Sequence, residues 1–225
     1  MAAGLNAALP PLLKDPMPND DIPTSAEDSE ARHKAKMQRH KAAVDARIAR
    51  ADQDTGLLLV LSGPGKGKSS SAFGMAARTL GHGGRVGVVQ FIKGAIPTGE
   101  ERFFRRFPDE VEFHVTGEGF TWETQNRARD VERVEAGWAI ARSLLQRLDI
   151  DLVVLDELNI VLAHDYLPVA TVLADLAARP AGQHVVVTGR GAPPELVEAA
   201  HTVSEIKVVK HAFKQGIRAQ PGIEF

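Results

Sequence analysis

The chain has 225 residues, no cysteine, 44% apolar and 25% charged residues, and a formal net charge of −2 at pH 7. The length fits one domain with added segments, and the small net charge argues against non-specific attraction to nucleic acid as the main activity. The lack of cysteine excludes disulfides, thiolate catalysis and cysteine-bound zinc, and no apolar run approaches the roughly 18 residues of a membrane span.

The N-terminal part of the sequence divides into a tail and a helix. Residues 1–28 contain five prolines and no sustained period, which predicts a flexible tail. They also lack the basic region and long apolar core of a signal peptide, so we expect a cytoplasmic protein. Residues 29–52 are rich in Ala, Lys and Arg and predict a helical arm. Its apolar residues are too few to bury a full face, so the arm is either solvated or docks on something anionic.

The stretch Leu57 to Ser71, LLLVLSGPGKGKSSS, organises the remainder, residues 53–225. A short apolar run before glycines predicts a buried strand, and residues 69–80 have the spacing of a helix. A strand, a glycine loop, Lys-Ser and a helix together predict a phosphate-binding loop, in which backbone N–H groups and the helix N-terminus face an anion. We therefore expect phosphate contacts from Gly63, Pro64, Gly65, Lys66, Gly67, Lys68, Ser69 and Ser70. Lys68 supplies a cation to the phosphate oxygens, and the Ser69 hydroxyl can bind Mg²⁺.

The loop is one residue shorter than the usual GxxxxGK[ST] pattern. Only Pro64, Gly65 and Lys66 separate the first glycine of the motif, Gly63, from the second, Gly67. Phosphates therefore need not lie as they do in ordinary phosphate-loop NTPases, and hydrolysis does not follow from the motif alone.

The later segments alternate between strands and helices. Strands are predicted at residues 86–91, 111–115, 150–155, 184–188 and 203–209, and helices at 100–107, 130–148, 168–178 and 193–200. Residues 118–126 predict a polar loop that carries two aromatic residues. This order predicts an α/β fold: a mainly parallel sheet covered on both faces, as in the three-layer sandwich of P-loop NTPases, preceded by the helical arm.

Polar residues follow several of these strands, where ligands of parallel sheets gather: residues 90–93, Asp156 with Glu157, and residues 188–190. LVVLDE, ending at Glu157, matches the apolar strand and acid that hold magnesium in phosphate-loop proteins, although such an acid can also cap the next segment. Glu157 would orient water in a hydrolase and would otherwise serve only the metal. Arg190, in TGRG, is a candidate clamp for triphosphate or ribose; the other interpretation is a surface arginine in a turn.

Several stretches together resemble one family. GPGKGKSSSAFGMAARTLGHG, VGVVQFIKG, GFTWETQN, VVLDELN, DYLP, VVVTGRG and the terminal VKHAFKQGIRAQPGIEF are similar to the ATP:corrinoid adenosyltransferases of the CobA/CobO/BtuR type, in the same order. The five-residue step from Gly63 to Lys68 is also the spacing of this family.

The resemblance implies transfer of the 5′-deoxyadenosyl group of ATP to cobalt(I) of a corrinoid, with release of triphosphate, in adenosylcobalamin biosynthesis or salvage. It implies ATP bound in reverse, Mg²⁺ or Mn²⁺ held by residues that include Glu157, and leaving-anion stabilisation by Lys66 and Lys68. The aromatics Phe120 and Trp122, which residue type alone would place in the core, would shape the lower face of the corrinoid. The family also implies a homodimer, in which the helical arm covers a partner's site, and a flavoprotein reductant.

Two residues depart from the family pattern, and two other functions stay open. Family members commonly have Asn at the position of Pro64, which lacks an N–H, and Thr at that of Ser69, where the hydroxyl is kept. The alternatives are a P-loop ATPase or small-molecule kinase, and a nucleotide-dependent binding module without chemistry. The products of a reaction with ATP separate these possibilities.

Overall fold

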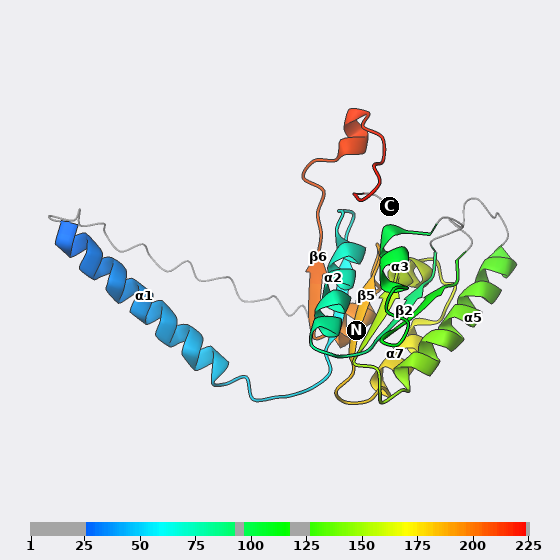
Figure 1. Ribbon diagram of the computed structural model, residues 1–225, viewed down its shortest axis with the longest axis horizontal. Coiled ribbons are helices and arrows are strands. Elements are labelled where there is room, and N and C mark those ends of the chain that lie inside the picture. Colours follow the sequence, from blue (N-terminus) through cyan, green and yellow to red (C-terminus); the bar gives the residue numbers. More distant parts are fainter. Residues whose placement is uncertain (1–25, 93–96, 118–126, 224–225) are drawn as a thin grey trace, which may run out of the picture. The chain divides into compact units, whose positions relative to one another are not determined.

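The computed structural model describes residues 26–92, 97–117 and 127–223, and the chain divides into two units, Met1–Gln53 and Asp54–Phe225. The first unit contains helix α1 (Ala26–Ile48) (Figure 1). Side chains 29–53 are exposed, and an ion pair of 2.6 Å joins Lys41 Nζ to Asp45 Oδ2 one turn later. The helix thus begins and ends slightly earlier than the arm predicted at residues 29–52.

The second unit is built on a six-stranded sheet with the order β3-β2-β4-β5-β1-β6 (Figure 1). All of its paired strands are parallel, as the alternation of strands and helices predicts. The strands are β1 (Leu58–Ser62), β2 (Val86–Gln90), β3 (Val111–Val115), β4 (Leu152–Asp156), β5 (His184–Thr188) and β6 (Thr202–Glu205).

Helices cover both faces of the sheet and give the predicted three-layer α/β sandwich. They are α2 (Lys68–Gly81), α3 (Gly99–Phe104), α5 (Arg127–Leu145), α6 (Leu158–Ala163), α7 (Val169–Ala177) and α8 (Pro194–Ala199), followed by the short 3₁₀ helix η1 (Ala212–Gln215). Phe73 of α2 and Phe104 of α3 belong to one apolar cluster with Val88 and Val154 of the sheet. Residues of α5 to α8 belong to a second cluster on the other face.

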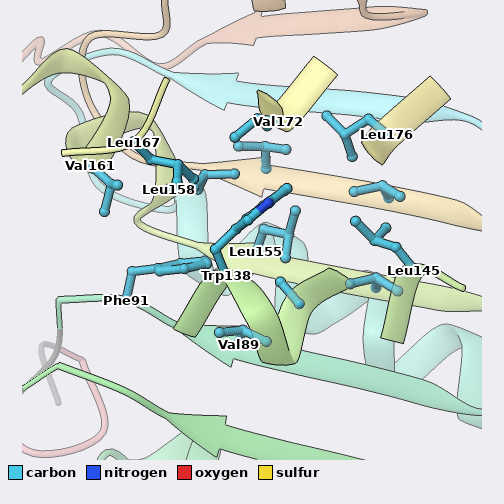
Figure 2. Packing of buried hydrophobic residues seen from close by; sticks show 14 of the residues in the cluster. Val89, Phe91, Trp138, Leu145, Leu155, Leu158, Val161, Leu167, Val172 and Leu176 are labelled. Carbon is cyan, nitrogen blue, oxygen red and sulfur yellow. The ribbon is translucent and has the colours of Figure 1, made fainter. Parts of the chain in front are cut away.

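The second cluster is centred on Trp138 of α5, which lies among Phe91, Leu155 and Leu158 (Figure 2). Its indole Nε1 donates to Asp175 Oδ2 of α7 at 2.8 Å, so the ring is buried while its polar atom is satisfied. Every residue of β2 and β4 is buried, because neighbouring strands and two helical layers enclose them. This explains why both strands are near-continuous apolar runs.

The structure differs from the sequence expectations in several places, and helix α5, Arg127–Leu145, begins and ends three residues before the helix predicted at 130–148. Helix α6 was not predicted, because six residues directly after a strand are too few to show a helical period. Strand β6 ends at Glu205 rather than at Val209, since the chain beyond Glu205 turns across the loop after β1. Among the residues that the structure describes, no helix has the length and apolarity needed to cross a membrane.

The carboxyl ends of the parallel strands meet at one edge of the sheet and bring separate sequence motifs together. β5 lies between β1 and β4, so the phosphate-loop strand and the strand ending in Asp156 flank Thr188. The register pairs Gln90 with Asp156 and Leu61 with Thr188. Ligands of open α/β sheets bind outside this edge.

A buried amide at the opposite end of the fold generates a stability prediction. Gln183 Nε2 donates to the carbonyls of Leu144, in the last turn of α5, and of Arg147 and Ile150, which follow this helix, at 3.1–3.2 Å. We expect Gln183→Leu to lower the free energy of unfolding by about 1–3 kcal/mol, because these buried acceptors lose their donor. Chemical denaturation measures this, with exposed Gln146→Leu as the control; equal stabilities of the two variants would contradict it.

Candidate functional site

The loop between β1 and α2 has the features of an anion site. Gly67 precedes α2 with φ 112° and ψ −3°, and no side chain caps the helix N-terminus. The left-handed backbone at Gly67 is accessible to glycine at little cost, and it turns the chain directly into the first helical turn. The N–H groups of that turn, which begins at Lys68, lack intrahelical acceptors and favour an anion. Ser70 is exposed and Ser69 half-buried in the same turn.

The three glycines of the loop differ in the space that a side chain would have. A Cβ on Gly63 would lie 2.6 Å from the carbonyl oxygen of Ile206, and a Cβ on Gly65 would lie 2.6 Å from the same oxygen. A Cβ on Gly67 would meet nothing within 4 Å. The Gly65 N–H donates to Ile206 O at 2.7 Å, and the Ile206 N–H donates to Ser62 O at 2.8 Å. The first half of the loop is therefore fastened to the chain after β6.

Lys68 is buried beneath the loop, with 8% of its surface exposed. Its Nζ donates to Gly65 O at 2.7 Å. Burial lowers the pKa of Lys68, the negative charge of Glu157 opposes that shift, and the charge of Arg190 adds to it. Asp156 raises the same pKa and Lys66 lowers it, both by less. Lys66, Glu157 and Arg190 thus lie close enough to Lys68 to affect its pKa, whereas their binding roles stay predictions.

Arg190 is exposed and lines an open hollow of about 440 Å³ beside the loop. Pro64 lines the same hollow on the phosphate-loop side, and Glu205 lines it at the end of β6. A guanidinium at this place can donate hydrogen bonds to the anionic group of a ligand that is bound at the loop.

Glu157 follows β4 in a left-handed conformation, φ 65° and ψ 15°, immediately before α6. Residues with a Cβ rarely adopt this conformation, and it occurs most often at functional positions. A Cβ on Gly189 would lie 3.2 Å from Glu157 Oε2, so the carboxylate lies against the glycine of TGRG. Asn159, which is fully buried, donates from Nδ2 to Gly189 O at 3.0 Å.

A buried polar chain joins the ends of β2, β4 and β5; the sequence placed Gln90, Asp156 and Thr188 at this edge of the sheet but did not predict that they bond to one another. Gln90 Nε2 donates to Asp156 Oδ2 at 2.8 Å, and Thr188 Oγ1 donates to Asp156 Oδ1 at 2.6 Å. The Glu157 N–H donates to Thr188 Oγ1 at 3.0 Å. A polar residue at the carboxyl end of an otherwise apolar strand, as at Gln90 and Thr188, was the available signal.

The residues of the site include oxygen ligands but no complete metal centre. The described parts of the chain contain no group of three or more His, Cys, Asp or Glu side chains that could hold a metal ion. A hydroxyl at Ser69 and a carboxylate at Glu157 are hard oxygen donors, which suit Mg²⁺ when phosphate oxygens and water complete its coordination. Phe120 and Trp122 lie outside the described residues.

Comparisons with known proteins place this site in a family context. Residues 54–225 match the model of the ATP:corrinoid adenosyltransferase BtuR/CobO/CobP family, and residues 24–48 match the cob(I)alamin adenosyltransferase N-terminal model. A corrinoid adenosyltransferase of Pseudomonas aeruginosa is 65% identical over 198 residues, 88% of this chain and 98% of the relative. Corrinoid adenosyltransferase CobA of Salmonella typhimurium is 48% identical over 88% of this chain and its own full length.

The fastening of the loop to Ile206 generates a prediction about Gly65. We expect Gly65→Ala to lower the free energy of unfolding by about 1–3 kcal/mol, because the added methyl would displace either the loop or the chain after β6. Gly74→Ala, on exposed α2 surface with open space around a Cβ, is the control and should gain up to about 1 kcal/mol. Thermal unfolding of the ligand-free variants measures the difference, and a neutral Gly65→Ala would show that the loop is not constrained at this point.

Proposed function

The chain belongs to the ATP:corrinoid adenosyltransferase family, and we infer that it transfers the 5′-deoxyadenosyl group of ATP to the cobalt of a reduced corrinoid. The match over residues 54–225 carries this conclusion, and the phosphate loop supports it at the level of individual residues. The corrinoid is the substrate: its cobalt(I) supplies an electron pair to the ribose C5′. The bond from C5′ to its oxygen then breaks, and triphosphate leaves with the negative charge.

This reaction requires little acid–base chemistry from the protein. Cobalt(I) is itself the nucleophile, so catalysis consists of positioning the two substrates, excluding water and stabilising the leaving triphosphate. We propose that Lys68, Lys66 and the N–H groups at the start of α2 stabilise that anion, with Gly63, Pro64, Gly65, Gly67, Ser69 and Ser70 forming the surrounding loop. Arg190 is proposed to contact ATP from the open hollow.

We propose that Mg²⁺, or Mn²⁺ in its place, is bound by the Ser69 hydroxyl and the Glu157 carboxylate together with phosphate oxygens. When bound, the ion neutralises part of the triphosphate charge. The negative charge of Glu157 opposes the lowering of the Lys68 pKa by burial, which supports a position beside the phosphates. The protein's own contribution is to hold the two oxygen donors on separate elements, α2 and the end of β4.

Helix α1 supports the proposal of a homodimer in which the arm covers a partner's site. Met37, Val44 and Ile48 are exposed and lie seven and four residues apart, so they share one side of the helix. The same helix carries many Lys and Arg side chains, which suit an anionic ligand. Analytical ultracentrifugation with and without ATP and corrinoid tests this proposal; a monomer under both conditions would contradict it. A cytoplasmic location and a flavoprotein reductant are likewise proposed.

The deciding experiment identifies the products. Purified protein is incubated with ATP, Mg²⁺ and chemically reduced cob(I)alamin, and the phosphorus products are separated. We expect triphosphate in equal amount to adenosylated corrinoid. ADP with phosphate, or with a phosphorylated acceptor, would instead support a P-loop ATPase or kinase, and no product would support a binding module.

Lys68→Ala tests the phosphate assignment in the same assay. We expect the rate of adenosyl transfer to fall by about 100-fold or more, on the order of 3 kcal/mol, because a buried cation that stabilises the leaving anion is lost. Arg78→Ala removes a cation from the exposed end of the same helix and should keep wild-type activity. A Lys68→Ala enzyme as active as Arg78→Ala would remove Lys68 from the mechanism.

Glu157→Gln tests the proposed metal ligand. An amide is a poorer ligand than a carboxylate for a hard cation, so we expect half-maximal activity to require several-fold more Mg²⁺. Glu195→Gln, on exposed α8 surface, is the matched control. Superimposable Mg²⁺ titrations of Glu157→Gln and wild type would exclude Glu157 as a ligand.

Phe120→Ala/Trp122→Ala tests the proposed lower face of the corrinoid. Aromatic rings there would exclude water and the axial base, so that cobalt(II) becomes easier to reduce. We expect the double variant to lose most activity from cobalt(II) with a flavoprotein reductant and to keep much of it from cobalt(I) prepared chemically. Equal losses in the two assays would contradict this role, as would an unchanged four-coordinate cobalt(II) signal in the variant.

A further inference from the structure

Asp156 occupies the strand-end position at which phosphate-loop proteins commonly hold magnesium, yet its surroundings suit a different task. Its exposed fraction is 0%. Gln90 Nε2 donates to one carboxylate oxygen at 2.8 Å, and Thr188 Oγ1 donates to the other at 2.6 Å. A carboxylate that is enclosed and bonded through both oxygens is poorly placed to bind an ion that arrives with ATP.

The direction of each hydrogen bond in this chain follows from the carboxylate. An ionised carboxylate only accepts, so the Gln90 amide must present its NH₂ group and Thr188 must point its hydroxyl proton at Asp156. The Thr188 oxygen then has its lone pairs available, and it accepts the Glu157 N–H at 3.0 Å. Asp156 therefore orients Thr188, and Thr188 in turn holds the backbone of Glu157.

The residue held in this way is in an unusual conformation. Glu157 has φ 65°, and apart from glycines the only other described residue with positive φ is Asp165. Such a backbone persists when surrounding contacts determine it. Thr188 supplies one such contact, and Gly189, with φ 125°, leaves room for the Glu157 carboxylate.

We propose that Asp156 and Thr188, supported by Gln90, are positioning residues that set the Glu157 carboxylate toward the metal–triphosphate, and that Asp156 is not itself a magnesium ligand. The inference rests on the proposed function, which makes Glu157 the acidic ligand. Sheet register explains why these residues can cooperate: Gln90 pairs with Asp156, and Leu155 pairs with Val187, directly before Thr188.

The test measures Mg²⁺-dependent ATP binding by calorimetry without corrinoid, so that no turnover is needed. Thr188→Val keeps the side-chain shape and removes both hydrogen bonds, and Thr188→Ser keeps the hydroxyl. We expect Thr188→Val to raise the Mg²⁺ concentration for half-maximal ATP binding roughly tenfold, as for groups that orient metal ligands. Because Thr188→Ser keeps the hydroxyl, its Mg²⁺ concentration for half-maximal ATP binding should stay within about threefold of the wild-type value.

A control variant and a double-mutant cycle distinguish the positioning role of Thr188 from a purely structural role. Thr79→Val removes a hydroxyl that donates within α2 and should leave the Mg²⁺ requirement unchanged even if it lowers stability. In a Glu157→Gln background, Thr188→Val should add little, because both changes act through the same carboxylate. Additive effects, or a Thr188→Val protein that is less stable but has a normal Mg²⁺ requirement, would overturn the proposal.

Two further outcomes keep the result interpretable. If Thr188→Val does not fold, Gln90→Met tests the other donor of Asp156 with the same readout and the same expected direction. If Glu157→Gln leaves the Mg²⁺ requirement unchanged, the metal assignment and this inference both fall, whereas adenosyl transfer is judged separately by the triphosphate product. Asp156→Asn could raise the Mg²⁺ requirement more than Glu157→Gln does, and could do so in the Thr188→Val background as well. That result would make Asp156 the ligand and overturn the proposal.

Discussion

The hydrogen bond from the Gly65 N–H to the carbonyl of Ile206, 2.7 Å long, determines how the phosphate loop can be used. It joins a loop near the start of the second unit to the chain that follows its last strand, and the Ile206 N–H completes the attachment through Ser62. Each such bond contributes only about 0.5–1.5 kcal/mol. Their effect on function is larger, because a fixed first half leaves Gly67 and the start of α2 as the part that can face an anion.

Beneath this loop, burial and the nearby negative charge have opposite effects on the pKa of Lys68. Burial disfavours the ammonium of Lys68, and the nearby carboxylate of Glu157 favours it. A triphosphate would add negative charge at the same point, so the cation is more stable with the ligand bound than without it. The polar chain through Asp156 and Thr188 keeps Glu157 in a backbone conformation that it would not otherwise favour. The charge of Lys68 beneath the loop and that of Glu157 after β4 therefore depend on each other.

The sequence was sufficient to predict the parallel α/β fold but not the buried polar contacts. Alternating apolar runs and helical periods predicted the parallel α/β sandwich, because strands such as β4 are buried on both faces and need continuous apolar residues. The positions of Lys68, Glu157 and Arg190 after three separate strands predicted that they lie at the same edge of the sheet. The Gln90–Asp156–Thr188 chain depends on cross-strand register, which is a long-range property that no local pattern encodes. Helix α6 was missed because its six residues are too few to show a helical period.

The structure also changes how the departure at Pro64 is understood. Proline has no N–H, so its presence in a phosphate loop would remove a donor from the ligand. Pro64 is exposed and lies between Ser62, which accepts from Ile206, and Gly65, which donates to it. A donor at residue 64 would therefore belong to the half of the loop that is fastened to the chain after β6. We propose that Pro64 stiffens this half of the loop, so that the triphosphate contacts proposed for Gly67, Lys68 and Ser69 do not need a donor at residue 64.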